Sequence, residues 1–172
     1  MSALSRSCGL TVKMKQYRIV PMTIVLLIVL ALDQLTKYLV ATQMSLGESI
    51  PLLGEFLSIT SHRNSGAAWG IFQGRMLFFY IITVVVLIFL VYFYKSEARD
   101  NWMMQIGITL LMTGAIGNFI DRLLFQEVVD FVDILIFNYD FPIFNVADSA
   151  LTVGVVMLLL EVFVTGRGKK QI

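Results

Sequence analysis

The sequence predicts an all-α polytopic membrane protein with four transmembrane helices and a small β-rich cradle on the membrane surface, and three observations support this prediction. The 172 residues are 58% hydrophobic and only 15% charged, and the mean hydropathy is +0.81. A soluble domain has about a quarter of its residues charged. Four apolar runs are long enough to span, since about 20 helical residues cross a bilayer. Between the first two runs lie short segments that alternate with period two, as strands do.

The first span is expected at 20–42, after a polar and basic tail at 1–19. The run is too long for the apolar region of a signal peptide and lacks a clear small-residue cleavage site, so it is interpreted as a retained helix. Met14 followed by Lys15 is a second plausible start, which makes residues 1–13 a candidate upstream extension.

Asp33 and Lys37 lie near the far end of this first helix. They are spaced i,i+4 with the acid first, so they share a face and can pair. In one interpretation, the two charges neutralise each other, which lets the helix place polar side chains in the membrane interface. The other is a brace for a catalytic cavity, and neither makes these residues the nucleophile.

Between the first and second spans, the apolar periodicity of residues 43–75 breaks into short pieces separated by glycine and proline. Residues 56–60 alternate with period two, which predicts short strands on the membrane surface. The segment 62–70, with the sequence HRNSGAAWG, includes Trp69, a residue type that suits the headgroup region. It is interpreted either as a polar loop or as a cradle that holds an extended peptide by backbone hydrogen bonds.

The other spans are expected at 76–94, 102–120 and 146–165. The second and third are joined by a short charged turn at 95–101, and the third and fourth by an acidic segment at 121–144. A basic tail at 166–172 follows. These boundaries predict one membrane domain over residues 20–165.

Lysine and arginine are unevenly distributed between the two ends of the predicted helices. Four lie in the N-terminal tail, two in the charged turn and three in the C-terminal tail, against three near the other connecting segments. An excess of Lys and Arg marks the cytoplasmic side. Both termini are therefore expected in the cytoplasm, with segments 43–75 and 121–144 on the extracytoplasmic face.

Polar residues gather where the third and fourth spans meet the acidic segment. Gly114, Asn118 and Arg122 recur at i, i+4 and i+8 and share one helix face. On the fourth helix, the residues at i, i+3, i+4 and i+7 are Asn145, Asp148, Ser149 and Thr152. Asn145 can cap that helix, and Asp148 falls in its first turn, where the helix dipole favours a carboxylate. Charged groups near hydrocarbon cost roughly 2.5 to 3.5 kcal/mol and usually serve a function.

Elimination narrows the chemistry of this cluster. The single histidine, His62, cannot build an H-E-x-x-H zinc site, and the lone Cys8 lies in the predicted cytoplasmic tail. Nothing in the spacing brings His62, Ser149 and a carboxylate together, whereas a serine with Lys37 as its base remains open. Two carboxylates in an interfacial cavity most simply make an aspartic protease, in which like charges share one proton.

A carrier is the main alternative from another functional class. Membrane carboxylates also relay protons, so polarity alone supports a proton-coupled carrier as well as it supports an enzyme. Many carriers contain repeated halves, and here the first two spans share no motif with the last two. A purely structural membrane protein would leave the intramembrane Asp, Asn and Arg residues without a purpose.

Five blocks of sequence resemble the lipoprotein signal peptidases, also called signal peptidase II. The blocks are DQLTK at 33–37, RNSGAAWG at 63–70, GAIGNFIDR at 114–122, VVDF at 128–131 and FNVADS at 144–149. The resemblance extends over all four predicted helices, from about residue 20 to residue 165, and the last two blocks are highly specific in that spacing. Only residues 1–13 fall outside the pattern.

The resemblance implies an aspartic endopeptidase of the bacterial cytoplasmic membrane. Such enzymes remove signal peptides from diacylglyceryl-modified prolipoproteins, on the N-terminal side of the lipidated cysteine. By motif position, Asp130 and Asp148 are the catalytic pair, and Asp121 is not catalytic. The site-lining residues by the same criterion are Asn64, Gly66, Asn118, Arg122, Asn145 and Ala147, and the supporting pair is Asp33 and Lys37.

The resemblance also implies the partners of the protein. They are prolipoproteins, membrane lipids and the cyclic peptide inhibitor globomycin. No metal or organic cofactor and no nucleic acid is expected, and the protein is expected to be a monomer.

Overall fold

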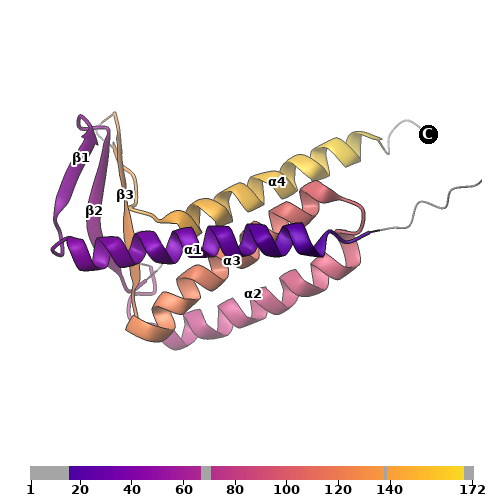
Figure 1. Ribbon diagram of the computed structural model, residues 1–172, viewed down its shortest axis with the longest axis horizontal. Helices are drawn as coiled ribbons and strands as arrows, with labels where there is room; N and C mark the ends of the chain where they lie inside the picture. Colours follow the sequence, from indigo (N-terminus) through magenta and orange to yellow (C-terminus); the bar gives the residue numbers. More distant parts are fainter. Residues whose placement is uncertain (1–15, 67–70, 138, 169–172) are drawn as a thin grey trace, which may run out of the picture.

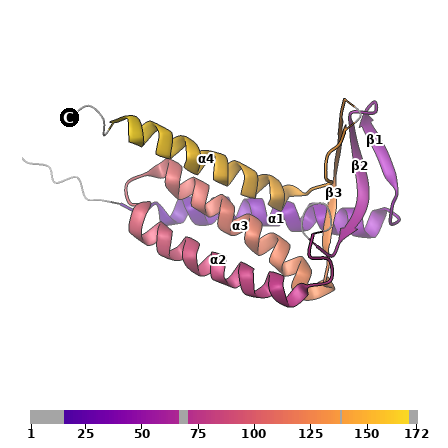
Figure 2. The same ribbon diagram turned by 180° about the vertical axis from the view of Figure 1, so that it is seen from behind.

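Four long helices run side by side, and a small sheet lies across one end of them (Figures 1 and 2). The computed structural model describes residues 16–66, 71–137 and 139–168, so Cys8, the segment 1–13 and Trp69 lie outside the described residues. The helices are α1 (Ile19–Gln43), α2 (Met76–Glu97), α3 (Trp102–Phe125) and α4 (Val146–Gly168). All four are long and apolar enough to cross a membrane.

The third helix lies at the centre of the bundle. It packs against α1, α2 and α4, and its apolar window is 44% buried, against 11% for those of α1 and α2. Glycines allow α3 and α4 to approach closely: a Cβ atom on Gly154 would lie 2.7 Å from the carbonyl oxygen of Gly107, and one on Gly114 would lie 2.7 Å from Cγ of Leu151. The small residues therefore bring the polar faces of the two helices together.

The third helix continues through Phe125, beyond the expected end near residue 120. Its last turn includes Asp121 and Arg122, whose polar side chains find partners inside the protein. The helix ends at Gln126, which has a left-handed backbone with φ of 59° and whose N–H donates to the carbonyl of Arg122 at 3.1 Å. These contacts of Asp121 and Arg122 thus let the helix extend into a segment that its acidic composition assigned to a loop, although Nε of Arg122 is buried without a hydrogen-bond partner among the described residues.

The sheet is antiparallel, with strand order β1-β2-β3-β4. The strands are β1 (Ser49–Leu53), β2 (Leu57–Asn64), β3 (Val128–Ile136) and β4 (Tyr139–Asp140). The alternating segment 56–60 lies mostly within β2, as its pattern predicts. Strand β3 gave no period-two signal, because its first four residues are all buried. A bulge between Ile59 and His62 precedes the pairing of His62 with Asp130.

A small apolar core joins the sheet to the helices. Val40 from α1 packs with Val129 and Phe131 of β3, and Ile59 of β2 and Val146 of α4 pack around them. This core fixes the start of β3 against the start of α4. Asp130 follows Val129 on β3, and Asp148 lies two residues after Val146 on α4. The core therefore holds the chain segments that carry both aspartates in one place.

Candidate active site

Asp130 and Asp148 reach the same groove from different elements. Asp130 lies on β3 and is only 2% exposed, whereas Asp148 lies in the first turn of α4. The groove has a volume of about 1170 Å³ and is open to the surface. Its polar end is lined by Asn64, Arg122 and the two aspartates, and its apolar walls come from α2, α3 and α4.

Amide groups hold all four carboxylate oxygens of these two aspartates. Asn145 bridges them: its Nδ2 donates to Oδ1 of Asp130 at 2.7 Å, and its backbone N–H donates to Oδ2 of Asp148 at 3.2 Å. Asn64 Nδ2 donates to the second oxygen of Asp130 at 3.0 Å, and Asn118 Nδ2 donates to the second oxygen of Asp148 at 2.7 Å. This arrangement fixes the orientation of both carboxylates without neutralising their charge.

The two carboxylates influence each other electrostatically. Burial, followed by the nearby charge of Asp148, raises the pKa of Asp130 from 3.8 to about 7, against the opposing hydrogen bonds from Asn64 and Asn145. A carboxyl group with that pKa holds a proton for much of the time at neutral pH. The pair can therefore present one acid and one base in the same groove, which is the requirement for general acid–base hydrolysis.

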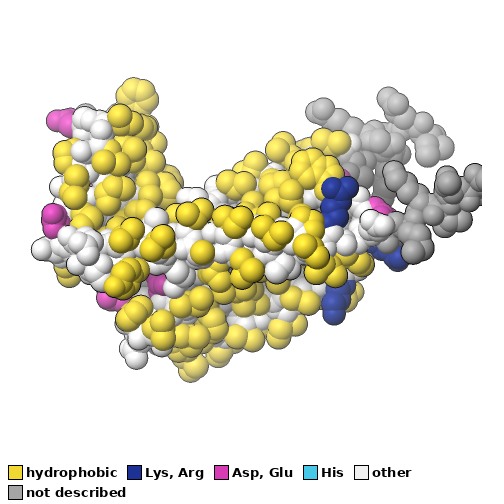
Figure 3. All heavy atoms as spheres, in the orientation of Figure 1, with side chains coloured by type: hydrophobic (Ala, Val, Ile, Leu, Met, Phe, Trp, Pro, Cys, Tyr) yellow, Lys and Arg dark blue, Asp and Glu magenta, His cyan; other side chains and the backbone are white. Residues whose placement is uncertain are grey.

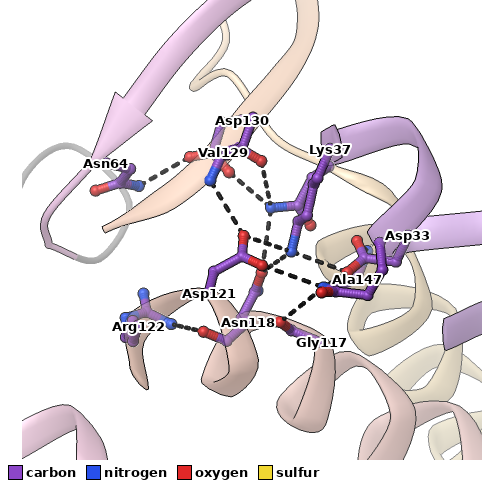
Figure 4. Close-up of polar contacts among 12 residues, drawn as sticks. Asp33, Lys37, Asn64, Gly117, Asn118, Asp121, Arg122, Val129, Asp130 and Ala147 are labelled. Carbon is purple, nitrogen blue, oxygen red and sulfur yellow. Dashed lines mark hydrogen bonds and ion pairs between the residues drawn. The ribbon is translucent and has the colours of Figure 1, made fainter. Parts of the chain in front are cut away.

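A buried ion triad lies beside this pair (Figure 4). Nζ of Lys37 lies 2.9 Å from Oδ2 of Asp33 and 3.1 Å from Oδ2 of Asp121, and it donates to Oδ1 of Asn118 at 2.9 Å. These three partners match the three donors of an ammonium group. The contacts argue against the serine/lysine alternative, because the three partners of Lys37 Nζ are Asp33, Asp121 and Asn118, and no serine is among them.

The two acids of the triad also hold the backbone next to each groove aspartate. Asp33 Oδ1 accepts from the N–H of Ala147 at 2.8 Å, and Asp121 Oδ2 accepts from the N–H of Val129 at 3.2 Å. Ala147 precedes Asp148 and Val129 precedes Asp130. One cluster of charges on α1 and α3 thus positions both chain segments that carry the groove carboxylates.

Arg122 connects α3 to the strand β2 side of the groove. Its NH2 donates to the carbonyl of Gly66 at 3.0 Å, and its guanidinium lies 4.5 Å from the ring centre of Phe79 on α2. Asn64 Oδ1 accepts from the N–H of Gly66 at 2.9 Å, so Asn64 and Arg122 together hold Gly66 at the groove.

The structure brings together all ten site residues that the sequence analysis named. Two of them occupy another place than expected: Asn145 and Ala147 are only 0% and 1% exposed and lie behind the groove instead of lining it. They act through hydrogen bonds to the aspartates and to Asp33.

Sequence reasoning missed Gln34. Its Nε2 donates to Oδ1 of Asp121 at 3.1 Å and to the carbonyl of Gly117 at 3.3 Å. Its position next to Asp33 in the DQLTK block was the available signal.

Among the described residues, no group of three or more His, Cys, Asp and Glu side chains could hold a metal ion. The clustered acids instead have a lysine and asparagine amides as partners.

A family model described as signal peptidase (SPase) II matches residues 25–164. The chain belongs to the signal peptidase II family. Curated lipoprotein signal peptidases from Staphylococcus aureus strains JH9 and Newman are each 52% identical over 157 residues, covering 91% of this chain and 96% of the relative. The resemblance predicted from the five sequence blocks is thus confirmed, and the chain is a peptidase of this family.

Solved structures of bacterial membrane enzymes share the fold. One, determined by the in meso method at 2.3 Å resolution, has a TM-score of 0.88 and 51% identity, covering 92% of this chain and 96% of that one. A second, at 1.9 Å resolution, has a TM-score of 0.81 and 53% identity over 86% of this chain and 96% of that one. The predicted fold of four spanning helices and a small antiparallel sheet is confirmed.

Proposed function

We propose that this member of the signal peptidase II family is an aspartic endopeptidase that removes signal peptides from diacylglyceryl-modified prolipoproteins, on the N-terminal side of the lipidated cysteine. The family and the names of the curated relatives support the substrate class. One observation supports the aspartic mechanism above all others: Asn145 hydrogen-bonds Asp130 and Asp148 in one groove, so that both can reach one scissile amide.

The unequal environments of the two aspartates suggest their roles. Asp130, with its pKa raised to about 7, begins protonated and donates a hydrogen bond to the scissile carbonyl oxygen. Asp148 begins ionised, supported by the N-terminus of α4 and by the N–H of Asn145. Asp148 takes a proton from water as the water oxygen bonds to the carbonyl carbon. At the same time, Asp130 gives its proton to the carbonyl oxygen.

Collapse of the tetrahedral intermediate then breaks the C–N bond. Asp148 returns its proton to the leaving nitrogen of the lipidated cysteine, and Asp130 recovers a proton from the intermediate as the new carboxylic acid forms. Both aspartates regain their starting states. The groove continues along apolar residues of α2 and α4, such as Val86 and Leu151, which suit an apolar signal peptide and acyl chains.

Conservative replacement of the pair tests this mechanism. Asp130→Asn and Asp148→Asn should each abolish cleavage while folding and membrane insertion persist, since asparagine keeps the shape and loses the titrating group. Purified variants would be incubated with a diacylglyceryl-modified prolipoprotein and scored by gel shift, with and without globomycin, which we propose as an inhibitor.

Asp133→Asn is the matched control, because Asp133 lies on the same strand but accepts from Thr60 at 2.7 Å, and it does not line the groove. Asp140→Asn should also leave substantial activity. Near-normal turnover of either Asp130→Asn or Asp148→Asn in folded protein would refute the pair.

We also propose that the protein spans the bacterial cytoplasmic membrane as a monomer, with both termini in the cytoplasm and the groove at the extracytoplasmic face. The last turn of α2, which includes Lys95, and the α2–α3 turn, which includes Arg99, lie at the end of the bundle opposite the sheet (Figure 1). This placement agrees with the excess of Lys and Arg on cytoplasmic segments.

Cysteine labelling tests the orientation. In a Cys8→Ser background, an impermeant maleimide added to intact cells should label Ser49→Cys on β1 and should leave Ser96→Cys at the end of α2 unlabelled until the cells are permeabilised. Efficient labelling of Ser96→Cys in intact cells would reverse the orientation and place the groove on the wrong side.

A further inference from the structure

A second cavity lies between α1 and α2, at the end of the bundle opposite the sheet (Figure 1). Both helices pack against α3 but scarcely touch each other, which leaves a crevice between them with α3 as its floor. We call this cavity the α1–α2 crevice. Its volume is about 220 Å³, and none of its lining residues lines the groove of the candidate active site.

The shape of the α1–α2 crevice suits one hydrocarbon chain. Its residues on α1 recur at i, i+3, i+4 and i+7, and they are Ile19, Met22, Thr23 and Leu26. They follow one helix face for about 10 Å, at about 1.5 Å of rise per residue. The volume is below the roughly 300 Å³ at which pockets for drug-sized ligands begin. A thin chain that runs parallel to the helices therefore fits better than a bulky ligand.

Basic side chains lie at the outer end of the crevice. Lys95 is exposed and belongs to its lining, and the exposed Arg18 directly precedes Ile19. Figure 3 shows Lys and Arg side chains at this end of the bundle. The acid nearest in sequence to Lys95 is Glu97, which falls on another helix face because it is only two residues away. A basic pocket between membrane helices is typical of phospholipid headgroup binding.

Hydrogen bonds hold these two basic residues next to each other. The ring of Tyr17 stacks on that of Tyr94 with centroids 5.7 Å apart, and its hydroxyl donates to the carbonyl of Lys95. Gln105 of α3 is fully buried, and its Oε1 accepts from the N–H of Arg18 at 2.9 Å. The segment that precedes α1 is thus fastened to the end of α2, so a site for a headgroup is already organised.

We propose that the α1–α2 crevice binds one anionic phospholipid from the leaflet at this end of the helices. An acyl chain lies between α1 and α2, and the phosphate lies at Lys95 and Arg18. The apolar part of the crevice belongs to helices that can span a membrane, so lipid is the molecule available to fill it. The two cations favour an anionic headgroup over a zwitterionic one, whose ammonium they would repel.

Native mass spectrometry of the full chain, released from detergent, tests the headgroup part of the site. The protein would be titrated with an equimolar mixture of phosphatidylglycerol and phosphatidylcholine of different chain lengths, and again with the chain lengths exchanged. One phosphatidylglycerol adduct should dominate in both mixtures. Lys95→Gln should weaken the apparent affinity for phosphatidylglycerol about fivefold, which corresponds to about 1 kcal/mol for one basic residue at an anionic surface.

Arg99→Gln is the matched control for Lys95→Gln. It removes the same charge from an exposed position at the same end of the bundle, but Arg99 does not line the crevice. Its affinity for phosphatidylglycerol should stay close to that of the parent. Equal losses in Arg99→Gln and Lys95→Gln would mean that lipid is attracted by the surface charge as a whole, and the proposal would be wrong.

A second pair of variants tests the chain part of the site without changing charge. Thr23→Trp fills the crevice, whereas Ile24→Trp adds the same bulk at a position that is 51% exposed and outside the lining. Only Thr23→Trp should lose the phosphatidylglycerol adduct. Thr23→Phe replaces it if the larger side chain prevents folding, which elution as a single species in size-exclusion chromatography would show.

The other outcomes contradict the proposal. Equal retention of phosphatidylcholine and phosphatidylglycerol by the parent would show that the headgroup is not recognised. Retention of phosphatidylglycerol by folded Thr23→Trp or Thr23→Phe would place the lipid outside the crevice. A dimer mass in the parent that Thr23→Trp abolishes would mean that a second copy of the chain covers the crevice.

Discussion

The two sides of α3 are built in opposite ways. On the side of α1 and α4, Asp33, Lys37 and Asp121 form a buried ion triad, and glycines bring α3 and α4 into close contact. On the side of α2, the groove opens between α2 and α4, and its walls include Ile82 and Thr83. The two sides therefore have different roles. Polar contacts on the side of α1 and α4 hold the two aspartates in place, while the side of α2 is open to a ligand.

We expect the largest effect from Lys37→Met, which disrupts the ion triad on the side of α3 that faces α1 and α4. The substitution keeps most of the side-chain volume but leaves the carboxylates of Asp33 and Asp121 unpaired at 3% or less exposure of either residue. Removing one partner of a buried charge cluster costs about 3 to 5 kcal/mol. We expect a large drop in the thermal unfolding temperature in detergent, together with loss of cleavage.

Arg63→Met is the matched control, because it opens the more exposed ion pair of Arg63 with Glu127, whose N and O atoms are 3.6 Å apart. Such pairs contribute about 0 to 1 kcal/mol, so its unfolding temperature should stay close to that of the parent. Equal unfolding temperatures for Lys37→Met and the parent would show that the triad is not a structural brace. Partial recovery in Lys37→Met/Asp121→Asn would identify the unpaired charge as the cause.

The pH dependence of stability is the next largest effect, and it reports on Asp130. Its pKa is 3.8 in the unfolded reference and about 7 in the folded protein, because burial and the charge of Asp148 disfavour the carboxylate. Between these values the folded state keeps a proton that the unfolded state has released. The free energy of unfolding therefore falls as the pH rises from about 4 to about 7, and this contribution is constant outside that window.

Chemical denaturation at a series of pH values measures this slope, and Asp130→Asn should flatten it. Cleavage by the parent should decline as the pH rises above about 7, where Asp130 loses the proton that the mechanism needs. An unchanged slope in Asp130→Asn would mean that another group titrates. Asp133→Asn again serves as the control on the same strand.

Some parts of this architecture could be predicted from the sequence, and others could not, for physical reasons. The helices follow from apolar length, and the i,i+4 spacing of Asp33 and Lys37 predicts their pairing, which is observed at 2.9 Å. The third member of the triad, Asp121, could not be paired with Lys37 from one sequence, because the contact joins residues far apart in the chain. The place of Asn145 behind the groove depends in the same way on tertiary packing.

The last prediction concerns the side of α3 that faces α2 and the groove. We expect the loss of a contact there to have the smallest effect on stability and cleavage. Tyr80 on α2 donates its hydroxyl to the carbonyl of Arg122 at 2.9 Å, and its ring packs edge-on against Phe119. Tyr80→Phe keeps the ring contact and removes one hydrogen bond, and the freed carbonyl still accepts from the N–H of Gln126 at 3.1 Å.

We therefore expect Tyr80→Phe to cost about 1 kcal/mol or less in unfolding free energy. Cleavage should stay within about twofold of the parent. A twofold change in rate corresponds to a change of under about 0.5 kcal/mol in the activation barrier, at about 1.4 kcal/mol per tenfold. Thermal unfolding and the gel-shift assay, run beside Lys37→Met, measure both quantities. If Tyr80→Phe loses activity as completely as Lys37→Met, then α2 positions the aspartates as tightly as α1 does, and the contrast between the two sides of α3 disappears.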